Sequence, residues 1–314
     1  MNFQQLRSVR EAVRCGLNLT EVSKVLHTSQ PGVSRQIREL EEELGIDLFV
    51  RAGKRLTSLT EVGELIVPIV ERMLNDADNL KRAGEEFTQQ ANGRLSIAAT
   101  HSQARYALPS AVRDFRQRYP QVTLNLHQGS PKQVAEMLIS GEADIGIATE
   151  ALTQYDALVT LPCYRWTHSV VVPPDHPLLD GQPLTLQRLA QFPVITYGTG
   201  YTGRLHIDEA FEFAGLSFNL VLTAMDADVI KTYVELGLGV GIVASIAFDE
   251  ERDRNLRAID ARTLFAVNLT KLAVRRGCFL RSYVYDFIET FASPLKREVV
   301  KRAMASAPGD LIDA

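Results

Sequence analysis

The chain has 314 residues, 46% of them hydrophobic and 23% charged, which is typical of a soluble globular protein with room for two or three domains. No apolar run approaches the roughly 20 residues that a membrane-spanning helix needs, and the amphipathic, charged N-terminus is unlike a signal peptide. The scattered cysteines Cys15, Cys163 and Cys278 argue against a disulfide framework or a zinc site. We therefore expect a cytoplasmic protein without a membrane partner.

The net charge of −4 would by itself argue against a nucleic-acid-binding protein, but the charges are unevenly distributed. Residues 1–60 hold nine Lys and Arg against seven Asp and Glu, a net charge of +2, and the remaining residues sum to −6. A mildly basic first segment on an acidic body suits a modular DNA-binding protein whose body is repelled by DNA.

The first expected helix covers residues 2–16 and ends at Gly16. Its apolar residues recur at helical spacing and should pack beneath the helices that follow: Phe3, Leu6, Val9 and Val13. A second helix is expected over residues 20–26. Together with the next helix they would form the three-helix core of a winged helix-turn-helix domain.

The third expected helix begins after Thr28 or Ser29, either of which can cap it, and ends at Gly45. Pro31 lies in its first turn, where a missing N–H costs nothing. Its buried stripe is expected to be Val33, Ile37, Leu40 and Leu44. The opposite side of its N-terminal half is polar and cationic, with Gln30, Pro31, Ser34, Arg35 and Arg38.

Gln and Arg read base edges with two hydrogen bonds, and Ser can bind a base or a phosphate. A recognition helix that enters the major groove by its N-terminal end needs this polarity. The competing interpretation is a small helical hairpin with a solvated charged face. A basic hairpin follows, in which Arg51, Lys54 and Arg55 cluster around Gly53, and it favours DNA binding because such a wing reaches phosphates or the minor groove.

A long helix is expected over residues 61–90, with Pro68 loosening its first turns. Apolar residues spaced by seven suggest a seam that pairs with another helix: Ile66, Met73, Leu80 and Phe87, with Val70, Ala77 and Gly84 between them. The alternative is a core helix of its own domain. Pairing would place two recognition helices on two half-sites of a roughly palindromic operator.

After a probable hinge at residues 91–93, short apolar runs alternate with helical stretches, which predicts parallel sheets in an α/β fold. The expected strands are 95–99, 122–127, 143–148, 166–172, 194–197, 220–223, 240–243 and 268–274. The expected helices are 103–119, 132–140, 204–214, 229–236 and 283–291. Two similar units in series with a late return suggest two lobes and a cleft between them.

Long stretches of the chain resemble the LysR-type transcriptional regulators. The stretches are SQPGVSRQIRELEEELGIDLFVR with LTSLTEVGE after it, and further on ATHSQARYALP, IATEAL, YGTGYTGR and DADVIKTYVELGLGVGIVA, which are similar to the CysB/Cbl branch. The resemblance implies a winged helix-turn-helix over residues 1–60, a dimerisation helix over 61–90, and a periplasmic-binding-protein-like effector domain over 91–293. It also implies dimers assembled into tetramers, promoter DNA and RNA polymerase as partners, and no enzymatic activity.

Within the effector domain, the resemblance implies crossings near Pro162 and Asn268. Lobe I would then cover about 94–162 and 268–293, and lobe II about 163–267. Residues 294–314 form a tail, to which we assign no role.

Polar residues follow several strands of this predicted domain, at helix N-termini where backbone N–H groups favour anions. They are Thr100, Ser102 and Gln103; Gly129 and Ser130; Thr149; and Thr202. Such donors could hold a small oxyanion without a cation, or they could simply cap the helices. For Ser102 or Thr202 taken singly, capping is the safer interpretation. Trp166, near the first crossing, could flank the pocket or pack in the core.

The CysB-like resemblance implies that Thr100, Ser102, Gln103, Thr149 and Thr202 bind sulfate or a sulfur-pathway metabolite. Candidates are O-acetylserine, N-acetylserine and adenosine phosphosulfate. Ser102 stands where the family pattern has threonine, which keeps the hydroxyl and leaves the ligand preference open. The resulting prediction is a regulator of sulfur assimilation, meaning cysteine biosynthesis and the use of sulfate or sulfonates.

Two alternatives belong to other classes. Residues 198–203 match GxGxxG after a strand, with Asp226 further on, as in NAD-binding enzymes. The motif lies mid-chain, however, and Tyr201 would crowd a pyrophosphate. The other alternative is an anion or nucleotide sensor whose helical head no longer reads DNA. The six histidines show no metal-ligand spacing, and no resident cofactor is expected.

Overall fold

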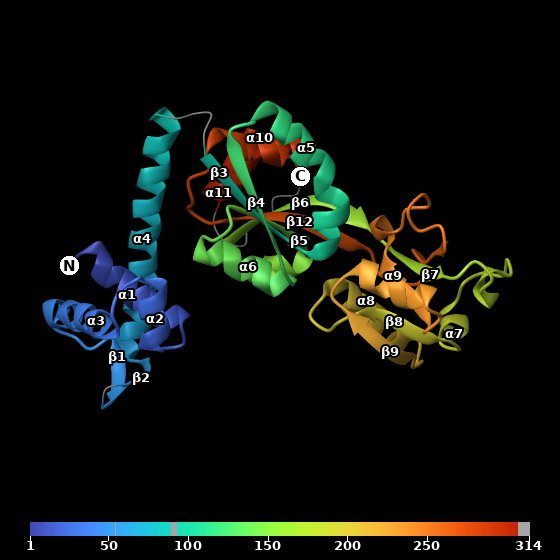
Figure 1. Ribbon diagram of the computed structural model, residues 1–314, viewed down its shortest axis with the longest axis horizontal. Helices are drawn as coiled ribbons and strands as arrows, with labels where there is room; N and C mark the ends of the chain where they lie inside the picture. Colours follow the sequence, from blue (N-terminus) through green and yellow to red (C-terminus); the bar gives the residue numbers. More distant parts are fainter. Residues whose placement is uncertain (54, 89–92, 307–314) are drawn as a thin grey trace. The chain divides into compact units, whose positions relative to one another are not determined.

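The structure is a computed structural model that describes residues 1–53, 55–88 and 93–306. The chain divides into two compact units, Met1–Thr88 and Gln89–Ala314 (Figure 1). Lys54, most of the predicted hinge and the last eight residues lie outside the described part. No helix among the described residues combines the length and the apolarity that crossing a membrane requires.

Three helices form the core of the first unit: α1 (Phe3–Arg14), α2 (Leu19–Val25) and α3 (Gln30–Leu44). Each begins with a polar cap, because the side chains of Asn2, Asn18 and Ser29 accept backbone N–H groups that a helix start leaves free. Gly45 ends α3 in the left-handed conformation, with φ 69°. The predicted helices and the Ser29 cap are confirmed.

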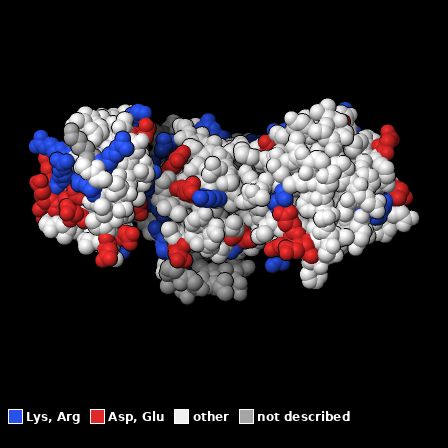
Figure 2. Space-filling view, turned by 90° about the horizontal axis from the view of Figure 1, so that it is seen from below, with Lys and Arg blue, Asp and Glu red and all other residues white. Residues whose placement is uncertain are grey.

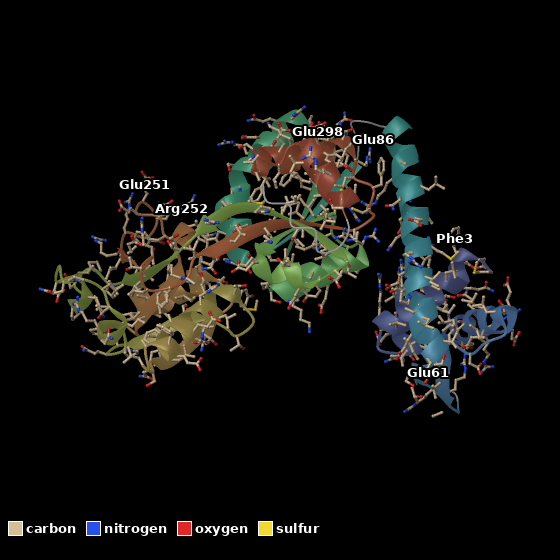
Figure 3. All side chains as sticks on the ribbon, turned by 180° about the vertical axis from the view of Figure 1, so that it is seen from behind. Phe3, Glu61, Glu86, Glu251, Arg252 and Glu298 are labelled. Carbon is tan, nitrogen blue, oxygen red and sulfur yellow. The ribbon has the colours of Figure 1, made fainter. Side chains whose placement is uncertain are left out.

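The core of this unit confirms most of the predicted apolar residues of the first and third helices: Leu6, Val9, Val33, Ile37 and Leu40 are buried. Two assignments are wrong. Phe3, which is labelled in Figure 3, is 53% exposed, and Leu44 is 39% exposed. Both lie in a terminal turn of their helix, beyond the point where the helices pack together.

Helix α4 (Glu61–Thr88) runs through Pro68 without a break. Its first half belongs to the core of the first unit, since Val67, Val70 and Leu74 are buried there. Gly63 is required by close approach, because a Cβ at this position would lie 2.1 Å from the carbonyl oxygen of Leu48.

The predicted seam of α4 is therefore divided. Ile66 and Met73 pack against the core of their own unit, as the alternative interpretation required, whereas Leu80 is 77% exposed. The side chain of Phe87 lies outside the description. Val62, Leu65 and Ile69 form a further exposed apolar stripe.

Lobe I of the second unit is built on a five-stranded sheet of order β4-β3-β5-β12-β6. Its strands are β3 (Gly93–Ala99), β4 (Val122–Gln128), β5 (Ile145–Thr149), β6 (Leu158–Trp166) and β12 (Asn268–Arg275). Strand β3 runs parallel to β4 and β5, and β12 runs antiparallel to β5 and β6.

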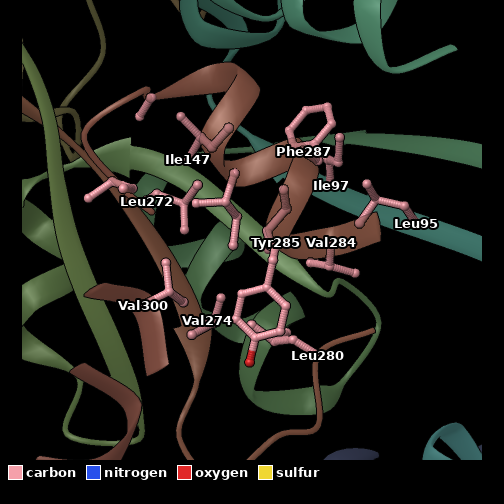
Figure 4. Packing of buried hydrophobic residues seen from close by; sticks show 14 of the residues in the cluster. Leu95, Ile97, Ile147, Leu272, Val274, Leu280, Val284, Tyr285, Phe287 and Val300 are labelled. Atoms are coloured by element: carbon pink, nitrogen blue, oxygen red, sulfur yellow. The ribbon is translucent and has the colours of Figure 1, made fainter. Parts of the chain in front are cut away.

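One face of the lobe I sheet packs on three helices, α5 (Leu108–Arg118), α10 (Ser282–Phe291) and α11 (Arg297–Ala305), around the core shown in Figure 4. The other face packs on α6 (Pro131–Ser140). Two short segments complete the lobe, the π-helix η1 (Gln103–Ala107) and the 3-10 helix η2 (Glu150–Gln154). Val300 and Ala303 of α11 are buried in this core, so these residues pack within lobe I instead of forming a separate tail.

Lobe II has a five-stranded sheet of order β11-β7-β10-β8-β9. Its strands are β7 (His168–Val172), β8 (Pro193–Tyr197), β9 (Asn219–Ala224), β10 (Val240–Ala244) and β11 (Arg257–Asp260). Two apolar clusters flank the sheet, one with α9 (Ala227–Glu235) and one with α8 (Thr202–Phe213). The remaining helices are short: η3 (Pro177–Leu179), α7 (Leu186–Leu189) and η4 (Ser245–Ala247).

The predicted parallel pairing is confirmed for β3 with β4 and β5 and for β8 with β9 and β10, but neither sheet is parallel throughout. Each sheet includes antiparallel strands, β12 and β6 in lobe I and β7 and β11 in lobe II. The expected strand 166–172 is two strands in different sheets that meet at Thr167, so the first crossing lies beyond Pro162. The chain returns into β12 at Asn268, as predicted.

Candidate functional sites

The exposed side of α3 carries the residues predicted to read DNA. They surround one shallow hollow lined by Gln30, Pro31, Ser34, Arg35, Arg38, Glu39 and Glu42. The hydroxyl of Ser29 accepts from the N–H of Gly32 at 3.2 Å and fixes the first turn of the helix. The opposite side of α3 is buried, so the side chains at the N-terminal half can face a groove of DNA.

An ion pair on the helix surface holds Arg35. Its Nε lies 2.7 Å from Oε1 of Glu39, one turn further on, while the Arg35 side chain stays 81% exposed. The hydrogen bond from Arg35, and then that from Gln5, lower the pKa of Glu39. Because this pair is exposed, Arg35 can exchange the carboxylate for a base edge at little cost.

The wing is a hairpin of β1 (Phe49–Ala52) and β2 (Arg55–Leu59), whose tip begins at Gly53 with φ 64°. Arg55 at the start of β2 is exposed, and Lys54 lies outside the described residues. Figure 2 shows Lys and Arg side chains beside Asp and Glu side chains on the first unit.

Arg51, which is predicted to contact DNA, forms an ion pair within the first unit. Its guanidinium pairs with Glu41, whose carboxylate is 5% exposed and also accepts from the N–H groups of Leu48 and Phe49 at 2.9 and 3.2 Å. The Arg51 side chain is itself only 22% exposed. The ion pair therefore joins α3 to the wing, and a contact of Arg51 with DNA stays a prediction.

A pocket lies between the two lobes of the second unit, with a cavity of about 30 Å³. Five of the seven predicted effector residues line it: Thr100, Ser102, Gln103, Thr149 and Thr202. The other lining residues are His101, Pro131, Trp166, Tyr197, Tyr201, Gly203 and Met225. The cavity holds about two water molecules, so a ligand with a nucleoside needs the lobes to move apart.

Hydroxyl groups meet across the pocket. The Oγ1 atoms of Thr149 in lobe I and Thr202 in lobe II are 2.5 Å apart, and Ser102 of lobe I and Tyr197 of lobe II both line the pocket. Neither Ser102 nor Thr202 caps a helix through its side chain. The safer interpretation of these two residues as caps is therefore wrong, and the Thr202 hydroxyl joins the two lobes.

Tyr197 was not among the predicted site residues. Burial raises its pKa to about 12, so the hydroxyl stays protonated, and the N–H of Ala244 donates to its oxygen at 2.9 Å. Tyr197 ends an apolar strand and is followed by glycines, a pattern that does not indicate a binding residue. Only the folding of strand β8 places this tyrosine in the pocket.

Gln103 is 1% exposed, and its amide is oriented by lobe I. Nε2 donates to Oγ1 of Thr270 at 3.1 Å, and the hydroxyl of Tyr164 donates to Oε1. One N–H of the amide remains for a ligand, since a carboxamide nitrogen carries two hydrogens.

Gly129 and Ser130 do not line the pocket, although their neighbour Pro131 does. Ser130 forms a capping box with Gln133 at the start of α6, and a Cβ on Gly129 would lie 2.9 Å from that of Gln133. The interpretation as a helix cap is therefore confirmed for Ser130.

The pocket is electrically neutral apart from His101. Among the described residues that line it, none is Lys, Arg, Asp or Glu. The indole Nε1 of Trp166 is buried, and no hydrogen-bond partner for it occurs within the described residues. Hydroxyl, amide and indole donors without full charges suit a small oxyanion whose own charge is stabilised by several hydrogen bonds.

The glycines of residues 198–203 have local explanations. Gly200 has φ 93°, and a Cβ on Gly203 would lie 3.0 Å from Nε2 of His168 and 3.3 Å from the ring of Trp166. Asp226, the candidate ribose ligand, caps α9 by accepting from the N–H of Val229 at 2.8 Å. The motif is thus accounted for by turn geometry and packing.

Comparison with known proteins decides the family. Residues 3–64 match the model of the bacterial regulatory helix-turn-helix protein, lysR family, and residues 88–295 match the LysR substrate binding domain. The chain belongs to the LysR family of transcriptional regulators.

Among LysR proteins, this chain is 54% identical to the HTH-type transcriptional regulator SsuR of Burkholderia cenocepacia, over 98% of this chain and 100% of that protein. It is 50% identical to the HTH-type transcriptional regulator cbl of Escherichia coli K12, over 100% of this chain and 99% of that protein. The crystal structure of the cofactor-binding domain of the Cbl transcriptional regulator superposes with a TM-score of 0.66 at 49% identity, and covers 68% of this chain and 95% of that domain. These matches confirm the predicted family and its CysB/Cbl-like branch.

Proposed function

We propose that this LysR protein is a cytoplasmic regulator of sulfur-assimilation genes, controlled by a small anionic sulfur metabolite bound between its lobes. The observation that carries the proposal is a pocket of neutral hydroxyl and amide donors from both lobes, in a chain similar over its whole length to SsuR and Cbl. The genes in question serve cysteine biosynthesis and the use of sulfate or sulfonates.

On DNA, the proposed base-reading residues are Gln30, Ser34 and Arg35, which share the exposed side of α3 with Pro31. Arg38, Arg55 and Lys54 would bind phosphates. The apolar stripe of Val62, Leu65 and Ile69 and the exposed Leu80 support pairing through α4, and thus a dimer that assembles into a tetramer.

In the pocket, the proposed effector residues are Thr100, Ser102, Gln103, Thr149 and Thr202. The small cavity favours sulfate or the head of O-acetylserine or N-acetylserine, whereas adenosine phosphosulfate requires a more open arrangement. An effector that contacts both lobes favours the arrangement in which they are closed, and only such a difference in affinity shifts the equilibrium between states. The shift would change how paired helices meet DNA and RNA polymerase.

An NAD-binding enzyme is a weaker alternative. Its motif is explained by the packing of Gly203 on His168 and by the capping role of Asp226. A sensor without DNA binding is disfavoured by the intact polar side of α3. We therefore propose no resident cofactor and no catalytic role.

The experiment is a fluorescence-anisotropy titration of a palindromic promoter fragment against the full-length protein, with scrambled DNA as competitor at two salt concentrations. It is repeated with sulfate, O-acetylserine, N-acetylserine and adenosine phosphosulfate. Specific binding that one of these compounds shifts would support the proposal and name the effector. Binding no tighter than to scrambled DNA, over several candidate promoters, would overturn it, and a titration with NADH would follow.

A further inference from the structure

A group of charged and polar side chains outside the pocket joins the two lobes. Arg105 and Tyr106 come from η1 of lobe I, and Asp228 and Lys231 come from α9 of lobe II. Nε of Arg105 lies 2.5 Å from Oδ2 of Asp228, and the hydroxyl of Tyr106 donates to Oδ1 of Asp228 at 2.8 Å. We call these four residues the interlobe latch.

The lobe II side of the latch is firmly anchored. Lys231 is 6% exposed, and its Nζ lies 2.9 Å from both carboxylate oxygens of Asp253 and 2.8 Å from the carbonyl oxygen of Ala247. Nζ also lies 3.1 Å from the hydroxyl of Tyr106 and 3.3 Å from Oδ1 of Asp228. A buried ammonium held by two carboxylates and a carbonyl oxygen has a fixed position, because moving away from the carboxylates would leave a buried charge uncompensated.

Asp228 stays ionised at neutral pH. Burial alone would raise its pKa, but the hydrogen bond from Tyr106 and the charges of Lys231 and Arg105 outweigh burial and lower it. His101, Asp226 and Asp228 bring three potential metal ligands within 4.8 Å, a grouping that their spacing in the sequence did not suggest. Arg105 and Lys231 already compensate the Asp228 carboxylate, so the cluster is better matched to joining lobes than to holding a cation.

The latch and the pocket share one turn of backbone. Gln103 lines the pocket at the start of η1, and Arg105 and Tyr106 lie two and three residues further on. The N–H of Leu108 bonds back to the carbonyl of Gln103, five residues earlier, which defines a π-helix. Such turns are rare and frequently occur at functional sites. The ring of Tyr106 also packs against the apolar core of lobe II.

We propose that the interlobe latch sets the fraction of molecules whose lobes are closed, and thereby the affinity for the effector, although none of its four residues lines the pocket. The pocket is complete only when Thr149 and Thr202 meet across the lobes. The apparent dissociation constant is the intrinsic one divided by the closed fraction. The class of ligand in this inference rests on the proposed function. The contacts that join the lobes do not depend on it.

The first test measures sulfate affinity of the full-length protein through the fluorescence of Trp166, the single tryptophan, which lines the pocket. The variants are Arg105→Ala and Tyr106→Phe, the second of which keeps the ring and removes only the hydroxyl. Both should bind sulfate more weakly, Arg105→Ala by about tenfold. The control Arg113→Ala removes an arginine of lobe I that pairs with the adjacent Asp114, and it should bind like the wild type.

The second test compares backbone hydrogen exchange without ligand. Both latch variants should exchange faster than the wild type in η1 and in α9, whereas Arg113→Ala should not. Wild-type sulfate affinity together with wild-type exchange in both variants would overturn the latch. If the wild type responds to none of the four candidate effectors, the proposed effector class is wrong, and the exchange measurement alone decides the latch.

Discussion

The recognition helix α3 and the pocket between the lobes both offer donors suited to a negatively charged ligand, yet in opposite surroundings. Arg35 and Arg55 are exposed full charges, and Arg35 is held by a surface carboxylate. Thr149 and Gln103 are buried neutral groups and Thr202 is half-buried; they are held by one another or by lobe I. The first arrangement gives binding that salt screens strongly, and the second gives binding that depends on shape and hydrogen-bond geometry.

The largest effect is expected at Glu41, a charged residue of the first unit that is buried, unlike Arg35 and Arg55. Glu41→Ala should destabilise the first unit by about 3–5 kcal/mol, because it leaves Arg51 and the N–H groups of Leu48 and Phe49 without their acceptor. Thermal and urea unfolding, followed by circular dichroism, measure the loss. The exposed neighbour Glu42→Ala is the control, and equal stability of the two variants would refute the assignment of Glu41.

The second prediction concerns His168, a titratable group buried in the second unit. Burial, and then the charge of His206, lower the pKa of His168 to about 4 from an ordinary value of 6.5. Between these values the unfolded chain binds more protons than the folded chain. Stability is therefore complete above pH 6.5 and falls as the pH decreases to about 4, by roughly 3 kcal/mol for this group.

The measurement is the unfolding free energy from pH 4 to 7 for the wild type and His168→Phe. The variant should lose less stability towards low pH than the wild type. Parallel pH profiles would mean that His168 is not a buried neutral imidazole.

The third prediction tests the neutral donors of the pocket. Thr202→Val keeps the shape and removes one hydroxyl, so the affinity for the effector should fall by about 10- to 100-fold, as for a hydrogen bond to a charged group. DNA affinity without effector should not change. Ser130→Ala is the control, since Ser130 caps α6 outside the pocket. An intact effector response in Thr202→Val would remove Thr202 from the site.

The fourth prediction tests the exposed charges for base reading. Arg35→Ala should weaken binding by about 1–3 kcal/mol, chiefly at one base position of the operator, because a bidentate contact is lost. Arg35→Lys keeps the charge but loses the forked geometry, and should relax specificity at the same position. Anisotropy over a panel of single-base operator variants measures both, and an equal loss on all sequences would contradict base reading.

The smallest expected effect concerns salt. Arg55→Ala should reduce the slope of log affinity against log salt by about 0.9, as for one lost phosphate contact. Lys132→Ala, which removes an exposed cation from the second unit, should leave the slope unchanged. An unchanged slope in Arg55→Ala would count against a contact between the wing and phosphate.

Local chemistry made much of this fold predictable. The Ser29 cap, the Gly45 stop and the apolar spacing define α3 within a few residues, and the same spacing defines most helices of the second unit. The proximity of Thr100 and Thr149 could be predicted because the ends of neighbouring parallel strands meet at one edge of a sheet. In each case the signal lies within a few residues of the structure that it specifies.

The contacts that sequence analysis missed join distant parts of the chain. Arg51 pairs with Glu41 only because the turn after α3 folds the hairpin back, and Tyr197 lines one pocket with Ser102 only because the two lobes meet. The late strand β12 enters lobe I antiparallel, although its composition resembles that of a parallel strand. Hydrophobic periodicity indicates which residues are buried, but it does not indicate which other part of the chain packs against them.

The close contact at Gly63 has a mechanical consequence. Because the backbone of α4 lies directly against Leu48 and the next turns are buried in the core, the base of this helix is fixed to the recognition helix and the wing. The 28 residues of α4 form an arm of about 42 Å. A rotation of about 5° at its base moves the free end by about 4 Å at this length. A small rotation of α4 at its base therefore produces a larger displacement at its far end.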